Sequence, residues 1–220
     1  HAVYNDRKGI LYNKDEKRPI VSRKYNHAWD QFDQRAYAKG GWVLHMLRTQ
    51  LGEDLFRRCV THYLRKNELS SVDTHDLQQA FEEITGLSLL PFFDQWVHNP
   101  GHPDLKVSYD WMPHEKLAKI SVEQLQAAAV AKGKEKDPAK NAADPPLFDL
   151  PLTLRFVGPD FVVDRDVMVN KKMQDFYVPL PEKPDVVRFD ARTQVLGSID
   201  FDKPNEMLYA QLQLQDDVVG

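Results

Sequence analysis

The sequence predicts an α+β protein in two parts, with helices to about residue 101 and an antiparallel β-sandwich from residue 102 to about 204. Apolar residues recur every three or four positions before Gly101 and every second position after His102. Hydrophobic residues make up 42% of the chain and charged residues 28%, which is ordinary for a packed globular protein. A chain of 220 residues is long enough for two small domains, each with its own core.

Four helices are expected in the first part. The first lies within residues 33–52, where Gly52 fits a C-terminal cap, and the second follows with an apolar stripe that includes Cys59. The third should begin at Asp73 or Thr74, either of which can cap a helix, and end at Gly86. The short fourth helix starts near Pro91, where a missing backbone N–H costs little.

Seven strands are expected in the second part. They are separated by turns rich in Pro, Gly and Asp, and several show one apolar face through strict alternation. The predicted strands are 105–111, 118–123, 150–156, 161–169, 175–180, 185–189 and 194–199. Residues 127–146 are low in complexity and are predicted to form a flexible loop inside the β domain. Residues 205–220 are predicted to begin a further helical region that is truncated here.

The composition excludes several classes of function. The net charge of -4 creates no field that would attract nucleic acid. No apolar stretch reaches the roughly 20 residues that a membrane helix needs. Cys59 is the sole cysteine, so an intrachain disulfide or a multi-cysteine metal site cannot form. A soluble protein is expected, and the sequence does not distinguish a cytoplasmic from a periplasmic or secreted location.

Motif searches alone yield no catalytic constellation. There is no HExxH zinc motif and no GxSxG nucleophile motif. His98 and His102 are four residues apart, but Pro100 and Gly101 prevent the helix that would align both rings on a metal. Cys59 lies on the apolar stripe of its helix and is interpreted as a small core residue.

Several segments resemble M1-family zinc aminopeptidases, the gluzincins. The run Tyr-Ala-Lys-Gly at 37–40, with the helix that follows and its Leu-Gly ending at 51–52, resembles the Tyr-x-Lys-Gly segment of that family. Phe-Phe-Asp-Gln-Trp at 92–96, with Gly-His-Pro at 101–103, resembles the end of the family's catalytic domain and the entry to a β-sandwich. Segments 120–124, 150–152 and 189–190 resemble strands of that sandwich.

This resemblance implies a domain organisation. Residues 1–101 would be the helical C-terminal part of a thermolysin-like catalytic domain, and residues 102–204 the following β-sandwich domain. The chain is then expected to be a fragment of a zinc-dependent aminopeptidase that hydrolyses N-terminal residues from peptides. The zinc ligands and the general-base glutamate of the family would lie upstream of His1, so the fragment alone is expected to bind no catalytic zinc and to be inactive.

The resemblance also assigns one catalytic residue, Tyr37. In the family, the tyrosine of this segment donates its hydroxyl proton to the oxyanion that forms when zinc-activated water attacks the scissile carbonyl. A phenol suits this task because it is a neutral donor with a pKa near 10. Spacing alone favours an ordinary aromatic residue at the start of a helix, packed in the core. Lys39 is compatible with a site residue or with a structural cation, and Gly40-Gly41 predicts a close approach of another backbone.

The expected partners are a peptide substrate and the remainder of the catalytic domain. One alternative is a non-catalytic module in which an M1-derived scaffold binds peptides or proteins. Another is an unrelated helical domain joined to an immunoglobulin-like adhesion domain. The presence of HExxH and a downstream glutamate in the parent reading frame would favour the enzyme over the binding module.

Overall fold

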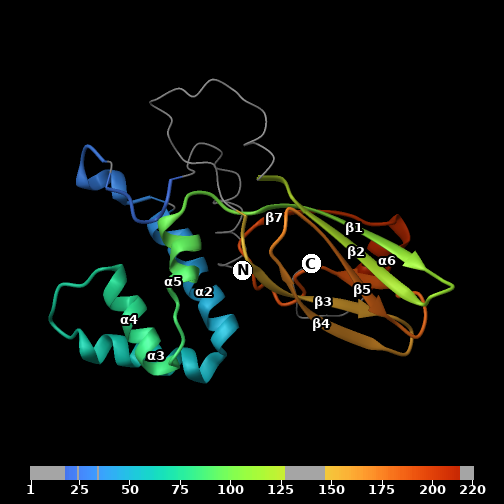
Figure 1. The fold of residues 1–220 in the computed structure, drawn as a ribbon, viewed down its shortest axis with the longest axis horizontal. Helices are drawn as coiled ribbons and strands as arrows, with labels where there is room; N and C mark the ends of the chain where they lie inside the picture. Colours follow the sequence, from blue (N-terminus) through green and yellow to red (C-terminus); the bar gives the residue numbers. More distant parts are fainter. Residues whose placement is uncertain (1–17, 24, 34, 127–146, 214–220) are drawn as a thin grey trace. The chain divides into compact units, whose positions relative to one another are not determined.

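The computed structural model describes residues 18–23, 25–33, 35–126 and 147–213. The chain divides into two compact units, His1–Gly101 and His102–Gly220, which are described separately below. The described part of the first unit is helical and that of the second is built mainly of strands (Figure 1). This confirms the predicted α+β class. The predicted loop at 127–146 and the end of the predicted C-terminal helical region lie outside the described residues.

The helical unit contains the four predicted helices, two of them with a π-helical portion. A 3-10 turn, η1, covers Ala28–Gln31, and a π-helical turn, η2 (Arg35–Lys39), leads into α2 (Gly40–Leu51). The later helices are α3 (Glu53–Lys66), α4 (Thr74–Thr85) and α5 (Leu90–Phe93), which continues as the π-helical turn η3 (Asp94–His98). The first predicted helix therefore begins as a π-helical turn, a feature that periodicity does not reveal.

Local chemistry fixes the ends of α4. The Asp73 carboxylate accepts from the backbone N–H of His75 at 2.7 Å, and the Asp76 carboxylate accepts from the backbone N–H of Asp73 at 2.8 Å. This reciprocal capping box satisfies N–H groups that lack partners inside the helix. Gly86 ends the helix in the left-handed conformation with φ 70°, as the sequence predicts.

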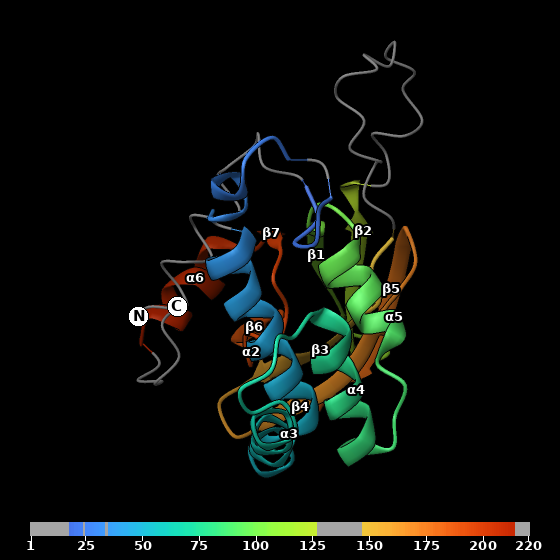
Figure 2. The same cartoon turned by 90° about the vertical axis from the view of Figure 1, so that its left-hand side faces the viewer.

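The core of the helical unit lies around α2. Trp42, Met46 and Leu47 of this helix are almost fully buried, as are Phe81 of α4, Phe93 and Trp96. The helices α3 and α4 lie side by side, and α3 also contacts α2 (Figure 2). The Phe56 and Phe81 rings meet edge to face at 5.7 Å. Cys59 is buried, which confirms its interpretation as a small core residue.

The described part of the β unit contains two sheets. One has the order β5-β2-β1-β7 and the other β4-β3-β6. The first sheet consists of β1 (Asp104–Met112), β2 (Leu117–Gln124), β5 (Met173–Pro179) and β7 (Ser198–Asp202). The second consists of β3 (Leu150–Val157), β4 (Val162–Val169) and β6 (Val186–Arg188). The sheets form two layers (Figure 1).

The core of the β unit comes from one face of each sheet. Buried side chains alternate along β2, and Leu150, Leu152, Leu154 and Phe156 are buried along β3. Two apolar sheet faces of this kind are typical of a sandwich. The helix α6 (Asn205–Gln213) follows β7 and contacts β6. No helix among the described residues is long and apolar enough to span a membrane.

Two details of the β prediction were wrong. The sandwich is not wholly antiparallel, because β7 pairs in parallel with β1, with Asp104 opposite Ser198. The last strand also begins later than predicted, at Ser198 rather than near residue 194. The Asp190 carboxylate accepts from the backbone N–H groups of Gln194 and Val195, at 2.7 and 3.2 Å, so this stretch forms a capped turn.

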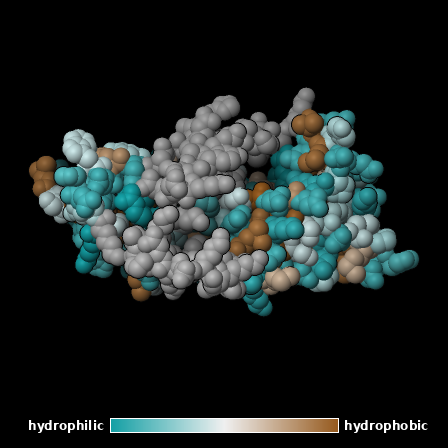
Figure 3. Space-filling model, turned by 90° about the horizontal axis from the view of Figure 1, so that it is seen from above, coloured by the Kyte–Doolittle hydropathy of each residue, from teal (hydrophilic) through white to brown (hydrophobic). Residues whose placement is uncertain are grey.

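Apolar side chains also occur on the surface. In the face that Figure 3 shows, hydrophilic residues predominate over the described parts and apolar ones form small groups. Among the described residues, the most exposed aromatic residue is Trp29, at 80%. Isolated surface apolar residues need no special explanation, but contiguous ones indicate a binding surface.

Candidate functional site

Tyr37 lies on the π-helical turn η2, which leads directly into α2. Arg35, Ala38 and Lys39 of the same turn are buried, whereas Tyr37 is 67% exposed. Tyr37 is therefore not a core residue of the described chain, and its phenol is available to solvent. Its catalytic role stays a prediction.

Asp33 caps the turn that carries Tyr37. Its backbone carbonyl accepts from the Tyr37 N–H at 3.3 Å. Its Oδ1 accepts from the backbone N–H of Arg35 at 2.8 Å and, more weakly, from that of Ala36 at 3.4 Å. Burial alone would raise the pKa of the Asp33 carboxyl, but the hydrogen bonds from the side chain and backbone of Arg35 lower it below its ordinary value.

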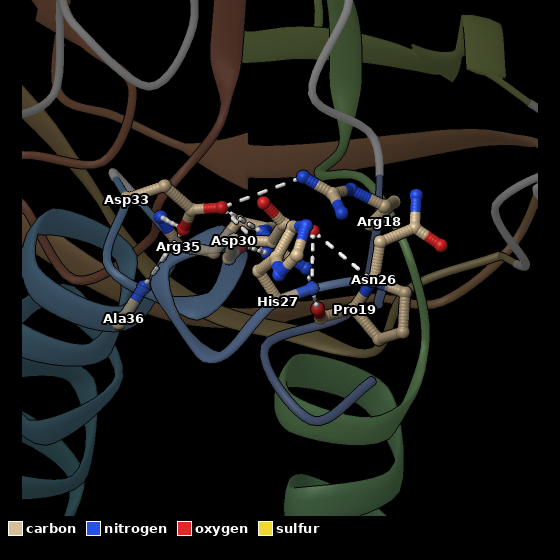
Figure 4. A network of polar contacts seen from close by, with 8 residues as sticks. All are labelled: Arg18, Pro19, Asn26, His27, Asp30, Asp33, Arg35 and Ala36. Atoms are coloured by element: carbon tan, nitrogen blue, oxygen red, sulfur yellow. Dashed lines mark hydrogen bonds and ion pairs between the residues drawn. The ribbon is translucent and has the colours of Figure 1, made fainter. Parts of the chain in front are cut away.

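Arg35 joins this cap to the preceding segment. Its guanidinium is 3% exposed and donates from Nε to Asp33 Oδ2 at 2.6 Å. It also donates from Nη1 to the Pro19 carbonyl at 3.2 Å and from Nη2 to the Asp30 carbonyl at 3.0 Å. Arg18 adds a longer ion pair to Asp33, at 3.5 Å (Figure 4). A planar guanidinium can bind several acceptors at once, which a lysine cannot do in the same geometry.

Asp30 organises the 3-10 turn next to this network. Its carboxylate accepts from the backbone N–H groups of Asn26 and His27, each at 3.1 Å (Figure 4). These two bonds, with the His27 bond contributing most, lower the pKa of the exposed Asp30 carboxyl. The carboxylate form thus closes the loop that presents the Asp30 carbonyl to Arg35.

Lys39 anchors the other end of the turn. Its side chain is buried, and Nζ donates to the Gly101 carbonyl at 3.0 Å, across 62 residues of sequence. Burial, and secondarily the nearby Arg35 charge, lower the Lys39 pKa to about 8. The structure thus places Lys39 as a buried cation that bridges two segments of the helical unit.

A row of exposed aromatic rings leads up to Tyr37. The ring centroids of Trp29 and Phe32 are 5.4 Å apart, and those of Phe32 and Tyr37 are 6.4 Å apart. Phe32 is 60% exposed. Other aromatic residues named by the sequence lie elsewhere: Phe93 and Trp96 are buried in the core.

The Gly40-Gly41 pair meets no close backbone within the described residues. A Cβ at Gly40 would lie 3.8 Å from the Arg35 carbonyl oxygen, an ordinary contact, and one at Gly41 would meet nothing within 4 Å. The predicted close approach is therefore wrong for the part of the chain that the structure describes.

The described residues do not fit a metal ion. They contain no group of three or more His, Cys, Asp or Glu side chains that could hold one. His62 and Glu83 do meet, at 2.7 Å between Nε2 and Oε2, but Glu83 also pairs with Lys66, at 2.6 Å between Oε1 and Nζ. A cation beside the carboxylate makes this contact an ion-pair link between α3 and α4.

Sequence reasoning found Tyr37 but missed the network around it. Neither Asp33 nor Arg35 stood out, because an Asp and an Arg two residues apart occur on many protein surfaces. The only available signal was the position of both residues just before a helix, where Asp is a good cap.

Comparison with known proteins shows similarity to aminopeptidases over part of the chain. Residues 11–96 match the model of the peptidase family M1 domain. A leucyl aminopeptidase of Saccharolobus solfataricus is 35% identical over 86 residues, covering 39% of this chain and 11% of the relative. Aminopeptidase 2 of Candida albicans is 38% identical over 76 residues, covering 34% of this chain and 8% of the relative. Aminopeptidase N of Lactococcus lactis is 36% identical over 67 residues, or 30% of this chain and 8% of the relative.

A solved structure supports the fold over most of the chain. Legionella pneumophila aminopeptidase A, in complex with aspartic acid, aligns with a TM-score of 0.69 over 92% of this chain and 22% of that chain, at 14% identity. The match of residues 11–96 to the M1 peptidase domain, and the aminopeptidase relatives, agree with the resemblance seen in the sequence. The chain spans about a tenth of the length of the first two of these curated relatives.

Proposed function

We propose that this chain is part of a zinc-dependent M1-like aminopeptidase that removes N-terminal residues from peptides, with Tyr37 as a catalytic residue. The proposal rests chiefly on one observation. Within the stretch that matches the M1 domain, a phenol stands exposed on a turn whose other side is buried and anchored.

The chemistry assigned to Tyr37 is hydrogen-bond donation. When a nucleophile adds to a peptide carbonyl, negative charge develops on the oxygen, and a donor already in place stabilises it without reorganisation. The Tyr37 hydroxyl can donate in this way because a phenol carries an O–H group that donates a hydrogen bond. A donor on an anchored helical turn also loses little conformational entropy on reaching the transition state.

The remaining catalytic parts belong to the proposed longer enzyme. Because the described residues do not fit a metal ion, the zinc ligands would come from sequence outside them. The remainder of the catalytic domain is the proposed partner of the aromatic row Trp29, Phe32 and Tyr37, all three of which are exposed. The 220-residue chain alone is proposed to be inactive.

The test is hydrolysis of matched peptides by the full-length protein. A peptide with a free N-terminus should be shortened from that end, and the same peptide with an acetylated N-terminus should resist. Chelation should abolish activity and added zinc should restore it. The 220-residue chain, assayed beside it, should release no amino acid. A full-length protein that binds the free peptide but neither contains zinc nor cleaves it would instead be a binding module.

A further inference from the structure

The turn η2 has two faces with opposite properties. Arg35 and Lys39 are four residues apart, about one helical turn, and both side chains are buried. Tyr37 lies halfway between them in sequence and is exposed. Two cations thus face the interior of the helical unit while the phenol between them faces outward. Burying two cations is costly unless each is hydrogen-bonded, and both of these donate to backbone carbonyls.

The two cations bind different parts of the helical unit. Arg35 reaches backbone carbonyls at Pro19 and Asp30, which precede the turn. Lys39 reaches the carbonyl of Gly101, at the end of the unit. Backbone carbonyls are acceptors whose positions are set by the chain and not by a side-chain rotamer. The turn is therefore tied on both sides of Tyr37 to separate segments.

We propose that Arg35 and Lys39 are positioning residues that fix the direction of the Tyr37 phenol by tying its turn to the segments at Pro19–Asp30 and Gly101. This inference rests on the proposed function, in which Tyr37 is the donor. Neither cation needs to touch substrate. Their effect on the reaction passes through Tyr37, and that dependence separates positioning from general support of the fold.

The decisive experiment is a double-mutant cycle in the full-length enzyme. Arg35→Met keeps the length of the side chain but removes its donors, and Tyr37→Phe removes the hydroxyl. If Arg35 positions Tyr37, Arg35→Met should lower kcat by roughly tenfold to a hundredfold with little change in KM. The same substitution in the Tyr37→Phe enzyme should lower kcat by less than about twofold, because no donor is left to misplace.

Matched controls separate positioning from a loss of folded protein. Arg48→Met removes another arginine, on α2, whose guanidinium is 53% exposed and pairs with Glu53, and should leave kcat unchanged. Arg35→Lys keeps the charge and should recover part of the lost kcat. If Arg35→Met does not fold, Arg35→Lys takes its place in the cycle. Lys39→Met should behave as Arg35→Met does, through the opposite anchor.

A second readout does not depend on activity. Amide hydrogen exchange of peptides covering residues 35–39 should accelerate in Arg35→Met and in Lys39→Met, while exchange in α4 stays unchanged. Equal loss of kcat in both backgrounds, or unchanged exchange in the turn, would overturn the inference. If Tyr37→Phe itself leaves kcat intact, the catalytic role of Tyr37 fails together with the positioning role. If Tyr37→Phe lowers kcat but Arg35→Met has the same effect with and without the Tyr37 hydroxyl, the positioning role alone fails.

Discussion

The two units use buried polar side chains for different ends. In the helical unit, the buried cations Arg35 and Lys39 hold one turn, and an exposed phenol stands on its other side. In the β unit, buried polar groups close connections between strands. The Gln124 amide, for example, donates to the Phe148 carbonyl at 2.8 Å and accepts from the Phe148 N–H at 3.0 Å. Asp190 caps the turn before β7 in the same way.

This difference distinguishes buried polar groups that only stabilise a connection from those that lie beside a candidate reactive group. A buried amide or carboxylate that satisfies loop backbone stabilises a connection and needs no further role. Burying two cations beside an exposed aromatic row has a larger desolvation cost than burying a neutral amide, and a helix end can be stabilised without it. We infer that the helical unit carries the reactive group and that the β unit is scaffold, and three substitutions sharpen this contrast.

The largest effect on stability is expected in the β unit. Phe156 is fully buried in β3, so Phe156→Ala should lower the free energy of unfolding of this unit by about 3–5 kcal/mol. Val162→Ala, at a position 65% exposed on β4, should change it by less than about 0.5 kcal/mol. Urea titration with hydrogen exchange of β3 and α2 peptides would measure both units. Equal losses in α2 would show that the units do not unfold separately.

A smaller effect, dependent on pH, is expected at Lys39. Its pKa falls from 10.5 when unfolded to about 8 when folded, because burial disfavours the charged form. Below pH 8 both states are protonated. Between pH 8 and 10.5 the unfolded state binds more protons, so stability should rise with pH relative to Lys39→Met, by about 3 kcal/mol in total.

Comparing the wild type with Lys39→Met isolates the contribution of Lys39 to the pH dependence of stability. Lys203, whose pKa burial and then Arg188 also lower to about 8, is present in both and cancels. Lys106→Met, which removes an exposed lysine of β1, is the matched control and should show no such difference. Urea denaturation at several pH values from 7 to 10.5 gives the measurement. If the difference in free energy of unfolding between wild type and Lys39→Met does not change with pH, burial of the Lys39 ammonium is contradicted.

The smallest effect is expected at a helix cap remote from Tyr37. Asp73→Ala removes the acceptor for the His75 N–H and should destabilise α4 by about 1 kcal/mol. Asp73→Asn should recover most of this loss, because the amide oxygen can accept the same bond. Thermal unfolding followed by circular dichroism would measure both. A drop in kcat with either variant would mean that the helical unit does not confine its chemistry to the end around Tyr37.

Regular elements were predictable because local periodicity and caps determine them. The cap at Asp73 and the end at Gly86 follow from side-chain chemistry within a few residues, and so does the alternation along β3. The parallel pairing of β7 was not predictable, because it depends on which strand a distant segment joins. The turn capped by Asp190 was mistaken for the start of that strand, since Val195 and Leu196 are apolar and buried there.

The site was predictable only in part. Tyr37 followed from the family resemblance, whereas spacing alone was compatible with a core aromatic, and the structure shows it exposed. The burial of Lys39 could not be foreseen, because its acceptor at Gly101 lies 62 residues away. The role of Arg35 likewise depends on the return of the Pro19 segment to the start of α2, which no local pattern records.

We infer that catalysis depends on the exposed phenol of Tyr37 in the helical unit, and not on exposure of a phenol in general. Tyr209 on α6 of the β unit has the same exposed fraction as Tyr37, 67%, and is its matched control. In the full-length enzyme at equal zinc content, Tyr37→Phe should lower kcat by about a hundredfold or more with little change in KM, and Tyr209→Phe should change neither. Equal activity of the two variants would contradict the account.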